Sequence, residues 1–189
     1  ERSAQKLMES ITSFFGRDQE ITDLLSILNS CRAANRPRWI QIQGASGSGK
    51  SSLLRAGLLP RLERDKDHWI IVPPFRPLAD PLRELSQALS TPLPAPPEGA
   101  EAAVVAAWAQ WIIDAAAMIR SGAQRPEATV LLSVDQLEEA VNPSRAGAVR
   151  DEDSPDRATL FLIALREARA RSDHRLLVIS TLRADTIGD

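Results

Sequence analysis

The segment from residue 44 to residue 51 reads Gly44-Ala45-Ser46-Gly47-Ser48-Gly49-Lys50-Ser51 and fits the P-loop pattern G-x-x-x-x-G-K-[ST]. Residues 38–43 before it predict a short strand, and leucines four apart after it, Leu54, Leu58 and Leu62, predict a helix. A strand, a glycine-rich loop and a helix in this order form the context in which such a loop binds phosphate. A Gly/Ser-rich linker is the alternative, but linkers seldom have an apolar strand and a leucine-spaced helix beside them.

The residue types of the loop match the chemistry of phosphate binding. Its glycines allow the backbone N–H groups to point at phosphate oxygens, and the helix start adds partial positive charge. We expect Lys50 to reach the β- and γ-phosphates and the Ser51 hydroxyl to ligate Mg²⁺. The expected nucleotide-binding residues of this segment are Gly44, Ala45, Ser46, Gly47, Ser48, Gly49, Lys50, Ser51 and Ser52.

Composition restricts the class of protein. The 189 residues fit one domain, and a net charge of −2 gives no direct evidence for nucleic acid binding. The single cysteine, Cys31, rules out an internal disulfide and suits a reducing compartment. The most apolar stretch, residues 102–118, is interrupted by Gln110 and Asp114, so we expect no membrane span. The N-terminus lacks a signal-peptide layout, and a cytoplasmic location is expected.

Strand and helix patterns alternate along the rest of the chain. Further strands are predicted at residues 68–72, 129–134 and 176–181, and helices at residues 18–35, 51–59, 82–89, 101–120 and 156–171. This alternation predicts a three-layer α/β fold of the P-loop NTPase type, with a mostly parallel sheet. The proline-rich segment 91–97 is expected to be a surface loop, and the polar segment 142–156 a mobile one.

Charged residues follow the ends of the later strands, where parallel sheets bind their ligands. Asp135 ends an apolar strand downstream of the P-loop, and it is expected to hold Mg²⁺; the alternative is a helix-cap aspartate. Glu138 or Glu139 is a candidate for the base that activates water; otherwise both are helix-start carboxylates. Arg183, after the fourth strand, is a candidate contact for the γ-phosphate or else a surface ion pair.

Four stretches together resemble the novel STAND NTPases of bacteria, which are signal-transduction ATPases related to the AAA+ group. They are Phe14-Phe15-Gly16-Arg17-Asp18-Gln19-Glu20, GASGSGKSSLLRAGLLPRL from residue 44, LLSVDQLEE from residue 131 and STLRAD from residue 180. The P-loop alone is generic, whereas its combination with SLLRAGLLPRL, VDQLEE and TLRAD is more specific. The resemblance extends from about Phe14 to the last residue.

The resemblance implies roles for individual residues. Phe15, Gly16 and Arg17 fall on the motif that borders the adenine and the phosphates. Asp135 falls on the Walker B acid, Glu138 and Glu139 on the downstream acidic pair, and Arg183 on the sensor arginine. Gln136 stands where ordinary AAA+ enzymes have glutamate, so the base comes from farther along the chain or hydrolysis is weak.

The function implied is an ATP-binding, slowly hydrolysing and Mg²⁺-dependent switch module of a larger signalling or defence protein. ATP would favour a self-associating active state, and hydrolysis to ADP would reset it. We expect residues 1–13 to be an arm or linker and residues 14–189 to be the NTPase core, ending before the lid, the winged helix and a downstream repeat or sensor domain. The alternatives are a non-hydrolysing, nucleotide-bound scaffold and a free-standing P-loop kinase of small molecules.

Overall fold

A computed structural model of the chain describes residues 17–33, 38–141, 157–172 and 175–184. Its centre is a sheet of four parallel strands in the order β1-β4-β3-β2. The strands are β1 (Trp39–Gly44), β2 (Trp69–Ile71), β3 (Thr129–Val134) and β4 (Leu176–Arg183). The sequence prediction of a parallel α/β sheet is therefore confirmed.

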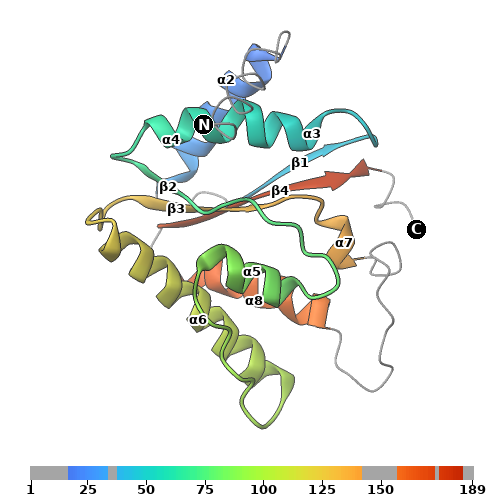
Figure 1. Cartoon of the computed structure of the whole chain (residues 1–189), viewed down its shortest axis with the longest axis vertical. Coiled ribbons are helices and arrows are strands. Elements are labelled where there is room, and N and C mark those ends of the chain that lie inside the picture. Colours follow the sequence, from blue (N-terminus) through green and yellow to red (C-terminus); the bar gives the residue numbers. More distant parts are fainter. Residues whose placement is uncertain (1–16, 34–37, 142–156, 173–174, 185–189) are drawn as a thin grey trace, which may run out of the picture.

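Helices cover both faces of the sheet and complete three layers, as Figure 1 shows. One face carries α2 (Asp18–Cys31), α3 (Lys50–Ser52), the π-helical segment η1 (Leu53–Leu58) and α4 (Leu59–Arg64). The other face carries α5 (Pro81–Leu89), α6 (Glu101–Gly122) and α8 (Arg157–Arg171). The short helix α7 (Glu138–Val141) follows the carboxyl end of β3.

Successive side chains of the central strands pack alternately into two apolar cores, one on each face of the sheet. On β3, Val130 and Leu132 pack with the α5–α6–α8 layer, whereas Leu131 packs with the layer of α2, η1 and α4. The same alternation holds on β4, where Val178 belongs to the first core and Ile179 to the second. All six residues of β3 are buried, as expected for a parallel strand covered on both faces.

The helix after the P-loop differs from the prediction in its length and its geometry. It was expected to end near Leu59, but the helical course runs through Pro60 to Arg64 and includes the π-turn η1. Pro60 has no backbone N–H to donate, and its ring would collide with the preceding turn of a regular α-helix. The wider π-turn relieves this conflict. Arg61 Nη1 donates to the carbonyl oxygen of Gly57 at 2.7 Å.

Helix α6 is more apolar than the sequence analysis expected. By length and composition it is able to cross a membrane, although 39% of its most apolar window is buried inside the protein. Trp108, Ile112 and Ala115 of this helix are buried in the core that α5, α6 and α8 share with the sheet. Core helices of globular domains pass the same test, so this finding is weak evidence for a membrane span.

Candidate functional site

The P-loop connects the end of β1 to the start of α3. Gly47 and Gly49 have positive φ angles of 74° and 80°, a region that residues with side chains rarely adopt. A Cβ atom on Gly49 would also lie 3.3 Å from Arg17 Nη1. Glycine at position 49 therefore permits both the left-handed turn and the close approach of an arginine to the loop.

Lys50 is folded over the loop that precedes it. Its Nζ donates to the carbonyl oxygens of Gly44 at 2.8 Å and Ala45 at 2.7 Å. Both acceptors are uncharged, so the ammonium keeps its full positive charge for an anion. The loop thus presents a localised cation next to a helix start, which is an arrangement that suits phosphate.

Arg17 is the part of the predicted adenine-side motif that the structure describes. Its Nη1 donates to the carbonyl oxygen of Ser48 at 3.0 Å, and its Nε pairs with Glu20 at 2.7 Å. The structure therefore brings Arg17 to the P-loop across 31 residues of sequence. Phe15 and Gly16 lie outside the described residues.

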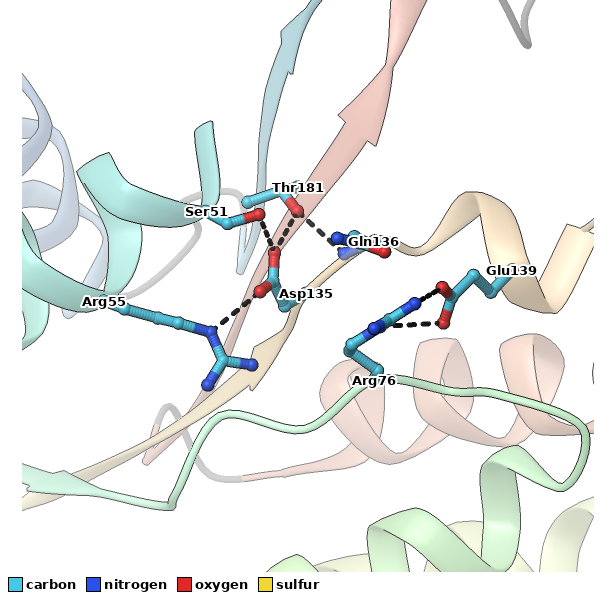
Figure 2. A network of polar contacts seen from close by, with 7 residues as sticks. All are labelled: Ser51, Arg55, Arg76, Asp135, Gln136, Glu139 and Thr181. Carbon is cyan, nitrogen blue, oxygen red and sulfur yellow. Dashed lines mark hydrogen bonds and ion pairs between the residues drawn. The ribbon is translucent and has the colours of Figure 1, made fainter. Parts of the chain in front are cut away.

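Asp135 is the centre of a polar network at the carboxyl end of the sheet (Figure 2). Ser51 Oγ and Thr181 Oγ1 each donate to Asp135 Oδ1 at 2.7 Å, and Arg55 Nε donates to Oδ2 at 2.8 Å. The donors come from α3, β4 and η1, while Asp135 directly follows β3. Val134 pairs with Ser180 in the β3–β4 register, so the next residue pair, Asp135 and Thr181, lies side by side.

The protonation of Asp135 reflects two opposing effects. The residue is only 2% exposed, and this burial raises the pKa of the carboxyl group. The hydrogen bonds from Thr181, Ser51 and Arg55, together with the charge of Arg55, outweigh burial and lower the pKa below its ordinary value. Asp135 is therefore a carboxylate at neutral pH despite its burial.

The turn after β3 is tied to β4 by Thr181. Gln136 has a φ of 58°, its N–H donates to Thr181 Oγ1 at 2.8 Å, and the N–H of Leu137 donates to the Thr181 carbonyl oxygen at 2.9 Å. This anchored turn begins α7, which carries Glu138 and Glu139.

The two glutamates of α7 have different partners. Glu139 forms a two-pronged ion pair with Arg76, which includes an Nε–Oε2 contact of 3.2 Å. Glu138 Oε2 instead accepts a hydrogen bond from the backbone N–H of Arg183 at 3.3 Å. Figure 2 shows that the Asp135 carboxylate points toward Ser51 and Thr181, whereas Glu139 points toward Arg76.

Arg183 ends β4 beside the start of the P-loop. In the β1–β4 register it pairs with Gly44, the first residue of the loop. The predicted sensor position therefore lies at the same sheet edge as Lys50 and Asp135.

The oxygen atoms at this edge fit a hard divalent cation. Ser51 and Asp135 present a hydroxyl and a carboxylate in direct contact. Among the described residues, no group of three or more His, Cys, Asp or Glu side chains is placed to hold a metal. Mg²⁺ usually takes one or two protein oxygens and completes its shell with phosphate and water, so this donor set suits Mg²⁺ held together with a nucleotide.

Three residues of this edge were missed by the sequence analysis, although each had a signal. Arg55 lies four residues after Ser51 and hence on the same helix face. Arg76 follows β2, the one strand whose carboxyl end was left out of the search for charged residues. Thr181 is a polar residue inside an apolar strand, directly before the segment LRAD.

Comparisons with known proteins agree with this fold. The family model Novel STAND NTPase 1 matches residues 8–189. No curated protein matches the chain. Solved structures with a similar fold include a chain of the E. coli MS115-1 HORMA:CdnC:Trip13 complex, at 19% identity and a TM-score of 0.51. That match covers 94% of this chain and 59% of the other, so this chain spans less than two thirds of its length.

A second match is C. elegans PCH-2, at 16% identity and a TM-score of 0.45, with 90% of this chain and 38% of the other covered.

Proposed function

Because the chain belongs to the Novel STAND NTPase 1 family, we propose that it is the ATP-binding switch module of a larger bacterial signalling or defence protein. The observation that carries this proposal is the 2.7 Å hydrogen bond between Ser51 and Asp135, which are 84 residues apart. It joins the hydroxyl that follows the P-loop lysine to a buried acid at the end of another strand. These two groups are the ones that a nucleotide-bound Mg²⁺ requires.

In this proposal, different residues of the site bind different parts of the nucleotide. The loop from Gly44 to Ser52 binds the phosphates, and Phe15, Gly16 and Arg17 border the adenine and phosphates. Ser51 and Asp135 would hold Mg²⁺, which neutralises phosphate charge when it is bound. The contact of Arg17 with Ser48 supports the placement of its motif at the loop.

We assign the general base to Glu138 and not to Glu139. Glu139 is engaged by the Arg76 guanidinium through two contacts, which occupy both carboxylate oxygens and leave them less accessible to a water. Glu138 Oε2 accepts a hydrogen bond from the backbone N–H of Arg183, and Glu138 is 6% exposed. A carboxylate held by a backbone N–H is better suited to orient or deprotonate an attacking water than one clamped by a two-pronged guanidinium contact.

Arg183 is proposed to read the γ-phosphate, because it pairs with Gly44 at the start of the P-loop. Replacement of Arg183 by alanine should weaken ATP binding by up to ~3 kcal/mol and change ADP binding little. Calorimetric titration of the variant with each nucleotide tests this role. An equal loss for ATP and ADP would contradict it.

The bound nucleotide is proposed to set the state of the module. ATP favours a self-associating active state and hydrolysis to ADP resets it, as the family resemblance implies. A non-hydrolysing scaffold would bind ATP but release no phosphate in a single-turnover assay. A small-molecule kinase would transfer phosphate to an acceptor in a screen of candidate substrates.

Lys50→Ala tests the central claim of nucleotide binding. Loss of the charge-assisted contact should reduce ATP affinity about 10–100-fold. The matched control is Lys66→Ala, because Lys66 is exposed and lies in the turn after α4. Calorimetry with Mg²⁺ present measures both affinities. Parental affinity in Lys50→Ala would remove the P-loop from the proposal.

A further inference from the structure

Arg55 places a positive charge on the acid that is expected to serve Mg²⁺. Its Nε contacts Asp135 Oδ2 at 2.8 Å, and the side chains are 42% and 3% exposed, respectively. The arginine is thus half in solvent, while the carboxylate is buried. We propose that Arg55 is a built-in cation that competes with Mg²⁺ for Asp135, and so sets the Mg²⁺ concentration at which ATP binds with its metal. This inference rests on the proposed function.

The helix after the P-loop carries both the expected metal ligand and its competitor. Ser51 and Arg55 are four residues apart, so both side chains leave the same face and reach Asp135. Each donates to a different oxygen of the Asp135 carboxylate: Ser51 to Oδ1 and Arg55 to Oδ2.

The acceptor sites of Asp135 are largely occupied in this arrangement. Oδ1 accepts from two hydroxyls, Ser51 and Thr181, and Oδ2 accepts from Arg55. A cation, or the water that it carries, must therefore share Oδ2 with the guanidinium or displace it. The repulsion between Mg²⁺ and the guanidinium is only weakly screened beside a buried carboxylate, so displacement of the guanidinium is favoured.

The contacts and the exposure of Arg55 allow its guanidinium to separate from Asp135. Among the described residues, Asp135 is the sole recorded hydrogen-bond or ion-pair partner of its guanidinium. The side chain is already half exposed, so its charge regains water readily. Arg55 also lies within the π-turn η1, and π-turns occur frequently at functional sites. The two hydroxyl donors keep the Asp135 carboxylate in place when Arg55 departs.

The decisive measurement is the ATP affinity of the chain as free Mg²⁺ rises from an EDTA-buffered baseline. Arg55→Gln and Arg55→Met remove the competing charge, and each should lower the half-saturating Mg²⁺ concentration about 10-fold. Arg55→Lys keeps a cation and should stay near the parent. Arg64→Gln is the matched control, since it removes an exposed arginine from the same helical course. The two neutral variants differ in polarity, so either one suffices when the other does not fold.

The possible outcomes separate this inference from the proposed function. An unchanged Mg²⁺ midpoint in both neutral variants overturns the inference, because Arg55 is then only a surface ion pair. A higher midpoint also overturns it and makes Arg55 a support of the metal site. If the parent itself binds no ATP at any Mg²⁺ concentration, the proposed function fails, and the inference fails with it. A lower Mg²⁺ midpoint in Arg55→Gln and Arg55→Met, with Arg55→Lys and Arg64→Gln near the parent, supports the inference and the proposed function.

Discussion

Asp135 and Glu139 are buried carboxylates four residues apart, and each is paired with an arginine, but the two sites are built differently. Asp135 accepts hydrogen bonds from three side chains, which belong to α3, η1 and β4. Glu139 depends on Arg76 alone among its recorded side-chain partners in the described residues, and Arg76 comes from the segment after β2. Figure 2 shows the first carboxylate among Ser51, Thr181 and Arg55, and the second pointing toward Arg76.

The difference separates an exchangeable partner from a structural one. If Arg55 moves away, Asp135 keeps two hydroxyl donors and its orientation. If Arg76 is lost, Glu139 stays buried without the ion pair that Arg76 gives it, and a buried carboxylate that loses its partner costs considerable free energy. A buried acid that follows Asp135 is therefore not a base by location alone, because its partner determines whether its oxygens are open to a water.

The largest effect that would test this contrast is on ATP hydrolysis. Glu138→Gln should bind ATP and hydrolyse it roughly 10²–10⁴-fold more slowly, because the amide keeps the shape of the side chain but cannot take a proton. Glu139→Gln should hydrolyse ATP at close to the parental rate, since the Arg76-paired acid does not act as a base. Single-turnover phosphate release measures both rates.

The reverse result would break the comparison. If Glu139→Gln is the slow variant, Arg76 must release Glu139 during turnover, and the ion pair is a resting state and not a fixed structure. If neither variant is slow, both glutamates are structural and the base lies elsewhere.

The second prediction concerns stability and compares the two arginines. Arg76→Gln should lower the free energy of unfolding by about 1–3 kcal/mol, toward the lower end because the Arg76 side chain is 46% exposed. Arg55→Gln should cost less than about 1 kcal/mol, since Asp135 keeps its hydroxyl donors. Urea unfolding measures both values. The double variant Arg76→Gln/Glu139→Gln should recover part of the loss; without recovery, the ion pair is not the cause.

The fold was predictable from the sequence because it depends on repeated, local signals. Apolar runs gave the four strands, and alternation with helical patterns gave the parallel order without any knowledge of contacts. Helix α5 was predicted at residues 82–89, and its start is capped by the Asp80 side chain, which accepts a hydrogen bond from the Arg83 N–H at 3.3 Å. The π-turn was missed because Pro60 was taken to end the helix, whereas the chain widens one turn and continues.

The site was predictable only in part, because its pairings are not local. Proximity of Ser51 and Asp135 follows from the rule that ligands bind at the carboxyl ends of parallel strands. The choice between Glu138 and Glu139 does not follow from it, since it depends on Arg76, which reaches α7 from 63 residues away. The strand pattern predicts which charged residues lie at one edge of the sheet, but it does not predict which of them form ion pairs.

The smallest expected effect is the pH dependence of the Asp135 site. The pKa of Asp135 is lowered because the hydrogen bonds from Thr181, Ser51 and Arg55 outweigh the opposing effect of burial. A lowered pKa in the folded state means that the ionised group stabilises the fold above the ordinary aspartate pKa of about 4, and that this contribution is lost as the pH falls through the lowered value. The difference in unfolding free energy between the parent and Asp135→Asn should therefore be constant from about pH 5 to pH 8. Below about pH 4 the parent should lose unfolding free energy relative to Asp135→Asn.

A loss that begins between pH 5 and pH 7 would mean that burial outweighs the three donors and that Asp135 is only weakly held as a carboxylate. The contrast with Glu139 would then lose its physical basis, because neither acid would be preorganised for a cation.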